Sequence, residues 1–421
     1  MILYLLFLSY VLQFLVAEVF FVSFILSCYI LYDQIILKKD DLFIIFLVLL
    51  PELVVVDING LSYRSSIRFL INIDLMFVAS IFSLCRNYLE KNVKLSNLIF
   101  FLYTVILIYS FVNLIILYLA GATHNQGLSY AFKAVLYISP LFMIYNNDWI
   151  NFKNQVLRII IASIFLIYIR EILFFNGMYV RGHLIFMAVA FIPFVIFYKF
   201  KISNLLLYLP SLFFITQQNI TVITIFLLSH LLFFFRKLSI FFNKISLIFL
   251  INFHVIVLII MGIVSYFIKN FFPESLIYSK FILDRMPLYI ASLEKLDFLS
   301  FELSPLVITG ESIFISATTG KEIYWSSGSH NYFLTMSLKL GLIPYLVLLF
   351  ILNLFLIKIY NRNKHDLNSS KNFNNLLFIS LLSSFAVISS TGNGYAENIG
   401  YLFFLLLGCI NSVISSNKKI I

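Results

Sequence analysis

Long apolar windows recur along the whole chain and constrain its fold more than any other feature. A helix that crosses the hydrocarbon core of a bilayer needs about 17–25 apolar residues. Windows near that length lie at 2–32, 42–56, 67–85, 97–119, 129–145, 156–175, 183–198, 203–216, 219–235, 246–268, 332–358, 374–391 and 395–415. They predict an all-α integral membrane protein, a polytopic bundle of about 12–14 transmembrane helices. The first window fits either one long helix or a tight pair.

The composition agrees with burial in lipid rather than in water. Of the 421 residues, 62% are hydrophobic and only 11% are charged, whereas about a quarter of a soluble domain is charged. So few charges cannot cover the surface of a water-soluble globule, and the apolar excess must therefore face lipid. The three cysteines, Cys28, Cys85 and Cys409, form no spaced cluster, so we expect neither a disulfide framework nor a metal site.

The distribution of basic residues orients the bundle. Alternation of the spans puts most of the 29 Lys and Arg on the side opposite the long polar loop, while the short loops on that loop's own side hold only Arg64, Arg68, Arg170 and Arg181. Short cytoplasmic loops are enriched in Lys and Arg. We therefore expect the long loop outside and the C-terminus inside. The same bias explains the net charge of +10 without nucleic acid as a partner.

One long polar segment, from about 269 to 329, interrupts the apolar pattern. We divide the chain into N-terminal transmembrane helices (1–268), a long extracytoplasmic loop (269–331) and C-terminal transmembrane helices (332–421), all within one membrane domain. The loop is rich in aromatic residues, which argues against disorder. We expect it to contain one or two short helices lying over the outer membrane face.

The junction between this loop and the next helix reads Ser329-His330-Asn331. Ser329 is a good N-cap residue, which predicts His330 in the first turn of the helix. The positive end of a helix disfavours an imidazolium ion, so we expect His330 to be neutral and able to accept a proton. Position alone also fits an ordinary interfacial histidine.

Two arginines fall on the same predicted side as His330. Arg285 lies in the long loop and Arg181 opens a helix. A guanidinium group binds phosphate oxygens through two parallel hydrogen bonds, and two such groups beside a helix N-terminus would suit a diphosphate. Each arginine alone also fits an ordinary rim charge. The sequence contains no Asp-x-Asp pair and no metal-spaced histidine cluster, so we expect no metal and no cofactor.

The stretch PLYIASLEKLDFLSFELSPLVITGES, followed after a gap by SHNYFLTMSLKLGLIPYLVLLF, resembles the signature of bacterial O-antigen polymerases and O-antigen ligases. The matching positions are Arg285, Gly310, His330, Asn331, Leu334 and Gly341-Leu342-Ile343, and Arg181-Gly182 is similar to an outer-loop arginine of that family. The likeness covers the whole hydropathy plan and is sharp over about 281–350.

This resemblance implies a membrane-embedded glycosyltransferase whose active site lies at the periplasmic face of the bacterial inner membrane. It implies an undecaprenyl-diphosphate-linked oligosaccharide as the substrate, with membrane lipids and a chain-length regulator as partners. His330 would be the general base of a metal-independent, inverting transfer, and Arg285 and Arg181 would hold the diphosphate. We expect Asn331, Ser329, Tyr324 and Trp325 to contact the substrate.

Two departures from the family pattern bear on the reaction. The sequence 216–219 reads Thr-Gln-Gln-Asn, without the arginine that many relatives carry there, and Tyr332 and Phe333 stand where ligases often have a carboxylate. The second departure favours a polymerase over a ligase, which would transfer finished glycan to lipid A core. A transporter or flippase is a further alternative, although neither an internal repeat nor a set of charges near the midplane supports it.

Overall fold

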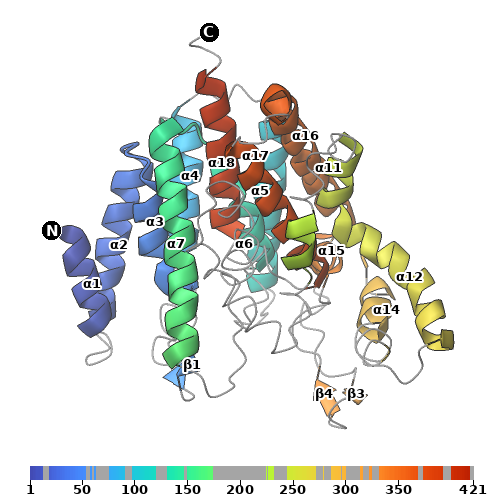
Figure 1. Ribbon diagram of the computed structural model, residues 1–421. Coiled ribbons are helices and arrows are strands. Elements are labelled where there is room, and N and C mark those ends of the chain that lie inside the picture. The colour runs from blue at the N-terminus through green and yellow to red at the C-terminus, as the bar shows by residue number, and fades with distance from the viewer. Residues whose placement is uncertain are drawn as a thin grey trace.

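Helices that run mostly side by side form the body of the protein (Figure 1). The computed structural model describes residues 1–12, 19–53, 57–58, 61–62, 75–90, 97–119, 130–146, 149–173, 224, 226–231, 244–271, 278, 286–294, 296–299, 313–315, 322–324, 331–367, 373–391 and 400–417. The last turn of α18 lies at one end of the bundle, and the small hairpin formed by β3 and β4 lies at the opposite end (Figure 1).

The elements follow one another along the chain as follows. The helices are α1 (Ile2–Leu12), α2 (Val19–Ile35), α3 (Leu42–Leu53), α4 (Leu75–Leu89), α5 (Asn97–Leu119), α6 (Tyr130–Leu136), the 3-10 helix η1 (Ser139–Phe142), α7 (Trp149–Leu173), α11 (Lys244–Ile251), α12 (Phe253–Phe271), α14 (Met286–Glu294), α15 (Tyr332–Leu340), α16 (Leu342–Leu367), α17 (Phe373–Thr391) and α18 (Gly400–Asn417). The strands β1 (Asp57–Ile58) and β2 (Leu61–Ser62) form one antiparallel pair, and β3 (Ile313–Ile315) and β4 (Glu322–Tyr324) form another.

Three helical stretches among the described residues are long and apolar enough to cross a membrane: Leu98–Ile116 in α5, Phe253–Phe271 in α12 and Leu342–Asn361 in α16. Shorter apolar helices, among them Phe21–Ile35 and Gly400–Ser412, accompany them. Many large apolar side chains on these helices are exposed, including Phe101 and Ile263. A helical protein with such a surface is suited to a lipid environment.

Several predicted windows coincide with helices. The windows 97–119 and 374–391 correspond to α5 and α17 almost residue for residue. The first window forms two helices, α1 and α2, and the hydroxyl groups of Tyr10 and Ser27 join them at 3.1 Å. The tight pair is therefore the correct alternative. The windows 183–198 and 203–216 lie outside the described residues, and 219–235 is described only in part.

The window 129–145 does not form one spanning helix, so this prediction was wrong. It contains the short helix α6, followed by the 3-10 helix η1 with Pro140 in its first turn. Proline has no N–H group and clashes with the preceding turn, so an α-helix cannot pass through this position undisturbed. The sequence pattern is apolar throughout, and apolarity alone cannot distinguish a full span from a shorter buried piece.

Two other windows are broken into pairs of helices. The window 332–358 divides into α15 and α16 at Gly341, whose φ of 93° is a backbone conformation that favours glycine. The window 246–268 divides into α11 and α12 at Asn252. Figure 1 shows α12 leaning away from the bundle after this break, with α14 beside it. Both breaks adjoin α15, because Gly341 ends this helix and the carbonyl group of His254, two residues after Asn252, accepts a hydrogen bond from its cap Asn331.

The long loop contains the expected short helix, α14, and also the hairpin of β3 and β4, which the sequence did not predict. Ile313 pairs with Tyr324 and Ile315 with Glu322 in its register. The loop begins slightly later than predicted because α12 continues to Phe271.

α18 and η1 approach each other closely. Gly408 of α18 faces the backbone carbonyl of Pro140 in η1 so closely that a Cβ atom at this position would overlap it. Small residues permit this approach, as they do at many helix interfaces in membranes. Gly262 of α12 is also helical, but a Cβ atom there would meet nothing within 4 Å.

The two glycines should respond oppositely to the same substitution. We expect Gly408→Ala to lower the free energy of unfolding by about 1–3 kcal/mol, because the η1 backbone would have to move. Gly262→Ala should be neutral or stabilise by up to about 1 kcal/mol, because alanine favours the helix. Thermal unfolding of the purified protein in detergent measures both, and equal melting temperatures for the two variants would contradict this account of the interface.

Candidate functional site

The described part of the chain contains two of the residues predicted to form the site, Asn331 and Tyr324. Tyr324 ends β4 and pairs through its backbone with Ile313. The other predicted residues lie outside the described residues: His330, Arg285, Arg181, Ser329 and Trp325. The surroundings of the site are therefore built from α14, which begins directly after Arg285, and from α15, whose cap directly follows His330.

Asn331, rather than Ser329, caps α15. Its Oδ1 accepts hydrogen bonds from the N–H groups of Phe333 at 2.9 Å and Leu334 at 3.3 Å, and its backbone is extended as in other N-caps. The prediction that Ser329 caps the helix and that His330 lies in its first turn was wrong. Both residue types are good caps, and only the fold decides which one reaches the free N–H groups.

The same amide also joins α15 to α12. Asn331 Nδ2 donates to the carbonyl oxygen of His254 at 3.0 Å, and the Asn331 side chain is 0% exposed. Asn331 thus accepts hydrogen bonds from α15 through Oδ1 and donates one to α12 through Nδ2. Its predicted contact with substrate stays a prediction, and such a contact would require these buried hydrogen bonds to open.

His254 has a partner on another helix. Its Nε2 lies 2.8 Å from the hydroxyl oxygen of Tyr345, in the first turn of α16. The rings of Tyr332 and Phe385 meet the imidazole edge-on, with centroids 5.9 and 6.1 Å away. We call these four buried residues the histidine box. The partner of His254 is 91 residues away along the chain, so no local sequence pattern indicates this contact.

A hydrophobic cluster joins the helix after Arg285 to the helix after His330. Met261 of α12, Tyr289 of α14 and Leu334 of α15 form its buried centre, and Met286 and Phe333 pack against them. We call this the α12–α14–α15 cluster. The chain segments that follow the predicted phosphate-binding arginine and the predicted base therefore share one packed cluster.

The long loop also completes the N-terminus of α16. The carbonyl oxygens of Asp297 and Phe298 accept the N–H groups of Leu342 at 2.9 Å and Ile343 at 3.1 Å. The next residue, Pro344, has no N–H to satisfy. Because the first N–H groups of a helix have no partner within it, these hydrogen bonds dock the loop on the start of α16.

A pair of asparagines supports the break between α11 and α12. Asn252 Nδ2 donates to Asn353 Oδ1 at 2.9 Å, and Asn353 Nδ2 donates back to Asn252 Oδ1 at 3.2 Å. Asn353 lies two turns after Tyr345 on α16. α16 thus binds one polar side chain at this break and another just after it, which holds α12 in its oblique position.

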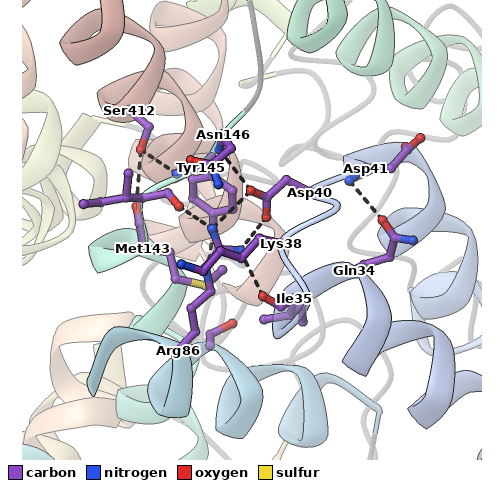
Figure 2. A network of polar contacts seen from close by, with 12 residues as sticks. Gln34, Ile35, Lys38, Asp40, Asp41, Arg86, Met143, Tyr145, Asn146 and Ser412 are labelled. Atoms are coloured by element: carbon purple, nitrogen blue, oxygen red, sulfur yellow. Dashed lines mark hydrogen bonds and ion pairs between the residues drawn. The ribbon is translucent and has the colours of Figure 1, made fainter. Parts of the chain in front are cut away.

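A second polar centre joins α4, the turn between α2 and α3, and the segment before α7 (Figure 2). Arg86, near the end of α4, is 1% exposed and forms a hydrogen bond with each of its five N–H groups. The acceptors are Glu90 Oε1 at 3.0 Å, the Ile35 carbonyl at 3.0 Å, Asp40 Oδ1 at 2.5 Å, Asp40 Oδ2 at 3.1 Å and the Ile144 carbonyl. Such complete pairing is what makes a buried guanidinium tolerable.

The turn between α2 and α3 is shaped around this arginine. Asp40 and Lys38 both have left-handed backbone conformations, with φ of 54° and 58°. Asp40 Oδ2 also accepts the N–H of Asn146 at 2.9 Å, and Lys38 pairs with Glu90 at 2.9 Å. Two basic and two acidic side chains meet here, so their formal charges cancel.

The segment before α7 ties α18 into the same centre. The N–H of Tyr145 donates to Ser412 Oγ at 3.2 Å, and the Tyr145 hydroxyl donates to the Pro140 carbonyl at 3.1 Å. The guanidinium carbon of Arg86 lies 5.7 Å from the centre of the Tyr145 ring. Burial raises the pKa of Tyr145 well above its ordinary value, so the phenol remains protonated and can donate this hydrogen bond.

The sequence analysis did not predict this Arg86 centre, because it counted basic residues only to orient the bundle. An arginine in the last turn of an apolar helix was the available signal, since charges at membrane depth need partners. The sequence did assign these segments to one side of the bundle, and their hydrogen bonds bring them together at one end. All five N–H groups of Arg86 have partners within the protein. We therefore assign the Arg86 centre a structural role, as a clamp that holds these segments together.

Comparisons of this chain with protein-family models, with curated proteins and with solved structures find no match.

The Arg86 centre should be far more sensitive than a surface ion pair. We expect Arg86→Gln to destabilise the protein by about 3–5 kcal/mol, because it leaves Asp40 buried without its charge partner. Lys39→Gln is the matched control, since Lys39 pairs with Asp33 at 2.6 Å while its side chain is 59% exposed. That variant should cost no more than about 1 kcal/mol.

Thermal unfolding in detergent, followed by size-exclusion chromatography, compares the yield and melting temperature of both variants. If Arg86→Gln melted within a degree or two of Lys39→Gln, the clamp would contribute little.

Proposed function

We propose that this protein is a membrane-embedded glycosyltransferase that polymerises O-antigen or a related bacterial surface polysaccharide. It transfers a growing glycan from undecaprenyl diphosphate to the acceptor sugar of a lipid-linked repeat unit. In this proposal, about 12–14 helices span the inner membrane, and the active site opens to the periplasmic side. The sequence resemblance around Arg285 and His330 provides the reaction class.

One structural observation carries the proposal further than sequence alone. The helix that starts directly after Arg285 and the helix whose cap directly follows His330 pack together in the α12–α14–α15 cluster. These two positions are about 45 residues apart along the chain, with a polar stretch between them. A base and a phosphate-binding arginine must act on one substrate, and this packing supports such an arrangement.

The proposed reaction begins with proton removal by His330. A neutral imidazole takes the proton from the acceptor sugar hydroxyl as its oxygen attacks the anomeric carbon of the growing glycan. The new glycosidic bond forms as the bond between that carbon and the diphosphate oxygen breaks. Attack from the face opposite the leaving group inverts the anomeric configuration.

The two arginines act on the leaving group. Negative charge accumulates on the diphosphate as the bond breaks, and guanidinium groups that are already in position stabilise it. Arg285 and Arg181 are proposed for this role because each can bind two phosphate oxygens at once. Together they supply two positive charges, the charge that a divalent cation supplies in metal-dependent enzymes.

The glycans of a deletion strain test this function. We expect loss of the gene to leave single repeat units on the lipid A core. Wild-type protein supplied from a plasmid should restore the ladder of polymer lengths. His330→Ala should not restore it, although the protein should accumulate to the wild-type level.

Each other outcome argues against one part of the proposal. Polymer stranded on undecaprenyl diphosphate in the deletion strain would point to a ligase instead. Full-length ladders made by His330→Ala would rule out its role as the base. An unchanged glycan profile would exclude both transfer reactions.

The arginine role predicts that charge alone is insufficient. Arg285→Lys should reduce polymer formation by about 10-fold or more, because lysine cannot reproduce the planar fork. Arg64→Lys is the matched control, since Arg64 lies in a different predicted outer loop. Ladder length and intensity at equal protein level measure both variants. If Arg285→Lys kept wild-type activity, Arg285 would be an ordinary surface charge and not a phosphate-binding residue.

A further inference from the structure

We propose that Asn331 is a positioning residue that holds His330 in place, and that the pair of His254 and Tyr345 fixes the point to which Asn331 is anchored. This inference rests on the proposed function for its effect on the reaction. Its structural part, that the anchor controls the backbone at position 330, can be tested without any activity.

The Asn331 side chain is a two-sided anchor. Oδ1 binds the N–H groups of Phe333 and Leu334 at the start of α15, and Nδ2 donates to the carbonyl oxygen of His254 at 3.0 Å. The side chain is 0% exposed, so water does not compete for these hydrogen bonds. The backbone of Asn331 is thereby held to two helices at once.

The residue type fits this double task better than other good caps. Ser, Thr and Asp also accept hydrogen bonds from helix N–H groups. Asn combines that acceptor with an NH2 group on the same planar amide, so one side chain can bind α15 and also reach α12. A helix cap alone would not need the amide nitrogen.

The residue to which Asn331 is anchored, His254, is itself held by buried partners. His254 is connected to α16 through its 2.8 Å contact with the Tyr345 hydroxyl. Tyr332, the residue after Asn331, lies edge-on to both rings, with centroid distances of 5.9 Å to His254 and 5.9 Å to Tyr345. The histidine box therefore fixes α12 and α16 relative to the start of α15.

This arrangement matters for the base because His330 is joined to Asn331 by one peptide bond. A general base must come within about 3 Å of the proton that it removes. A misplacement of about 1 Å can reduce the rate by about 100-fold. Fixing the backbone of Asn331 restricts where His330 can lie, and it does so without a substrate contact by Asn331.

Kinetics of purified protein in lipid vesicles test the effect on the reaction. Asn331→Ser keeps a cap acceptor but is too short to reach His254, and Tyr345→Phe removes the supporting hydroxyl without changing Asn331. We expect Asn331→Ser to lower kcat by about 10- to 100-fold with KM nearly unchanged. Tyr345→Phe should lower kcat by a smaller factor. A simple loss of folded protein would not change kcat per folded molecule.

Ser337→Ala is the matched control. Ser337 lies on the same helix, and its hydroxyl is buried with no hydrogen-bond partner in the part of the chain that the structure describes. Removing it should leave kcat, KM and the yield unchanged. If Asn331→Ser behaved like Ser337→Ala while His330→Ala was inactive, the positioning role would be overturned although the proposed function survived.

A labelling experiment separates the two ideas further. In a Cys85→Ser background, His330→Cys is labelled with a water-soluble maleimide, alone or combined with Asn331→Ser or Ser337→Ala. We expect Asn331→Ser to change the labelling rate by about 10-fold and Ser337→Ala to leave it unchanged. This result would support the anchor even if no variant made polymer. Equal labelling rates in all three proteins would overturn it.

Discussion

Polar groups within an apolar bundle must find their partners inside the protein, because lipid offers none. This requirement is met at the buried Arg86 and at the starts of α15 and α16. Arg86 satisfies all five of its N–H groups with carboxylates and carbonyls. Asn331 satisfies the start of α15, and the carbonyls of Asp297 and Phe298 satisfy the start of α16. The starts of α15 and α16 are therefore completed by a side chain and by a loop, respectively.

The two polar centres differ in the kind of groups that they join. The Arg86 centre joins the α2–α3 turn, α4, the segment before α7 and α18, and its charges cancel within the protein. Around α12, α15 and α16, the polar contacts are neutral and stand next to broken helices. In our proposal, one end keeps the bundle assembled, while the region of broken helices presents the reacting residues to a lipid-linked substrate. The exposed apolar surface of α12 suits contact with lipid.

Sequence reasoning succeeded where the signal was local. The apolar windows anticipated α5 and α17, and the polar loop was expected to contain a short helix such as α14. For the first window, the pair of α1 and α2 was one of the two alternatives that the sequence left open. Sequence reasoning failed where a helix is interrupted, at Pro140, Asn252 and Gly341. Mean hydropathy is an average over a window, so it does not reveal where a helix is interrupted. The backbone groups at such a break are hydrogen-bonded by residues far away in the chain, and hydropathy contains no information about them. The same averaging concealed the hairpin of β3 and β4.

The sequence by itself determined that the chain is apolar, rich in helix and able to cross a membrane. That Arg181, Arg285 and His330 lie on one side of the bundle stays a prediction from the alternation of spans. Only the tertiary structure decided that Asn331 rather than Ser329 caps α15, that His254 pairs with Tyr345, and that Arg86 is a buried clamp instead of a loop charge. Composition and periodicity are properties of neighbouring residues. Hydrogen bonds between residues tens to hundreds of positions apart depend on how the helices pack, and packing decides which polar group lies within reach of another.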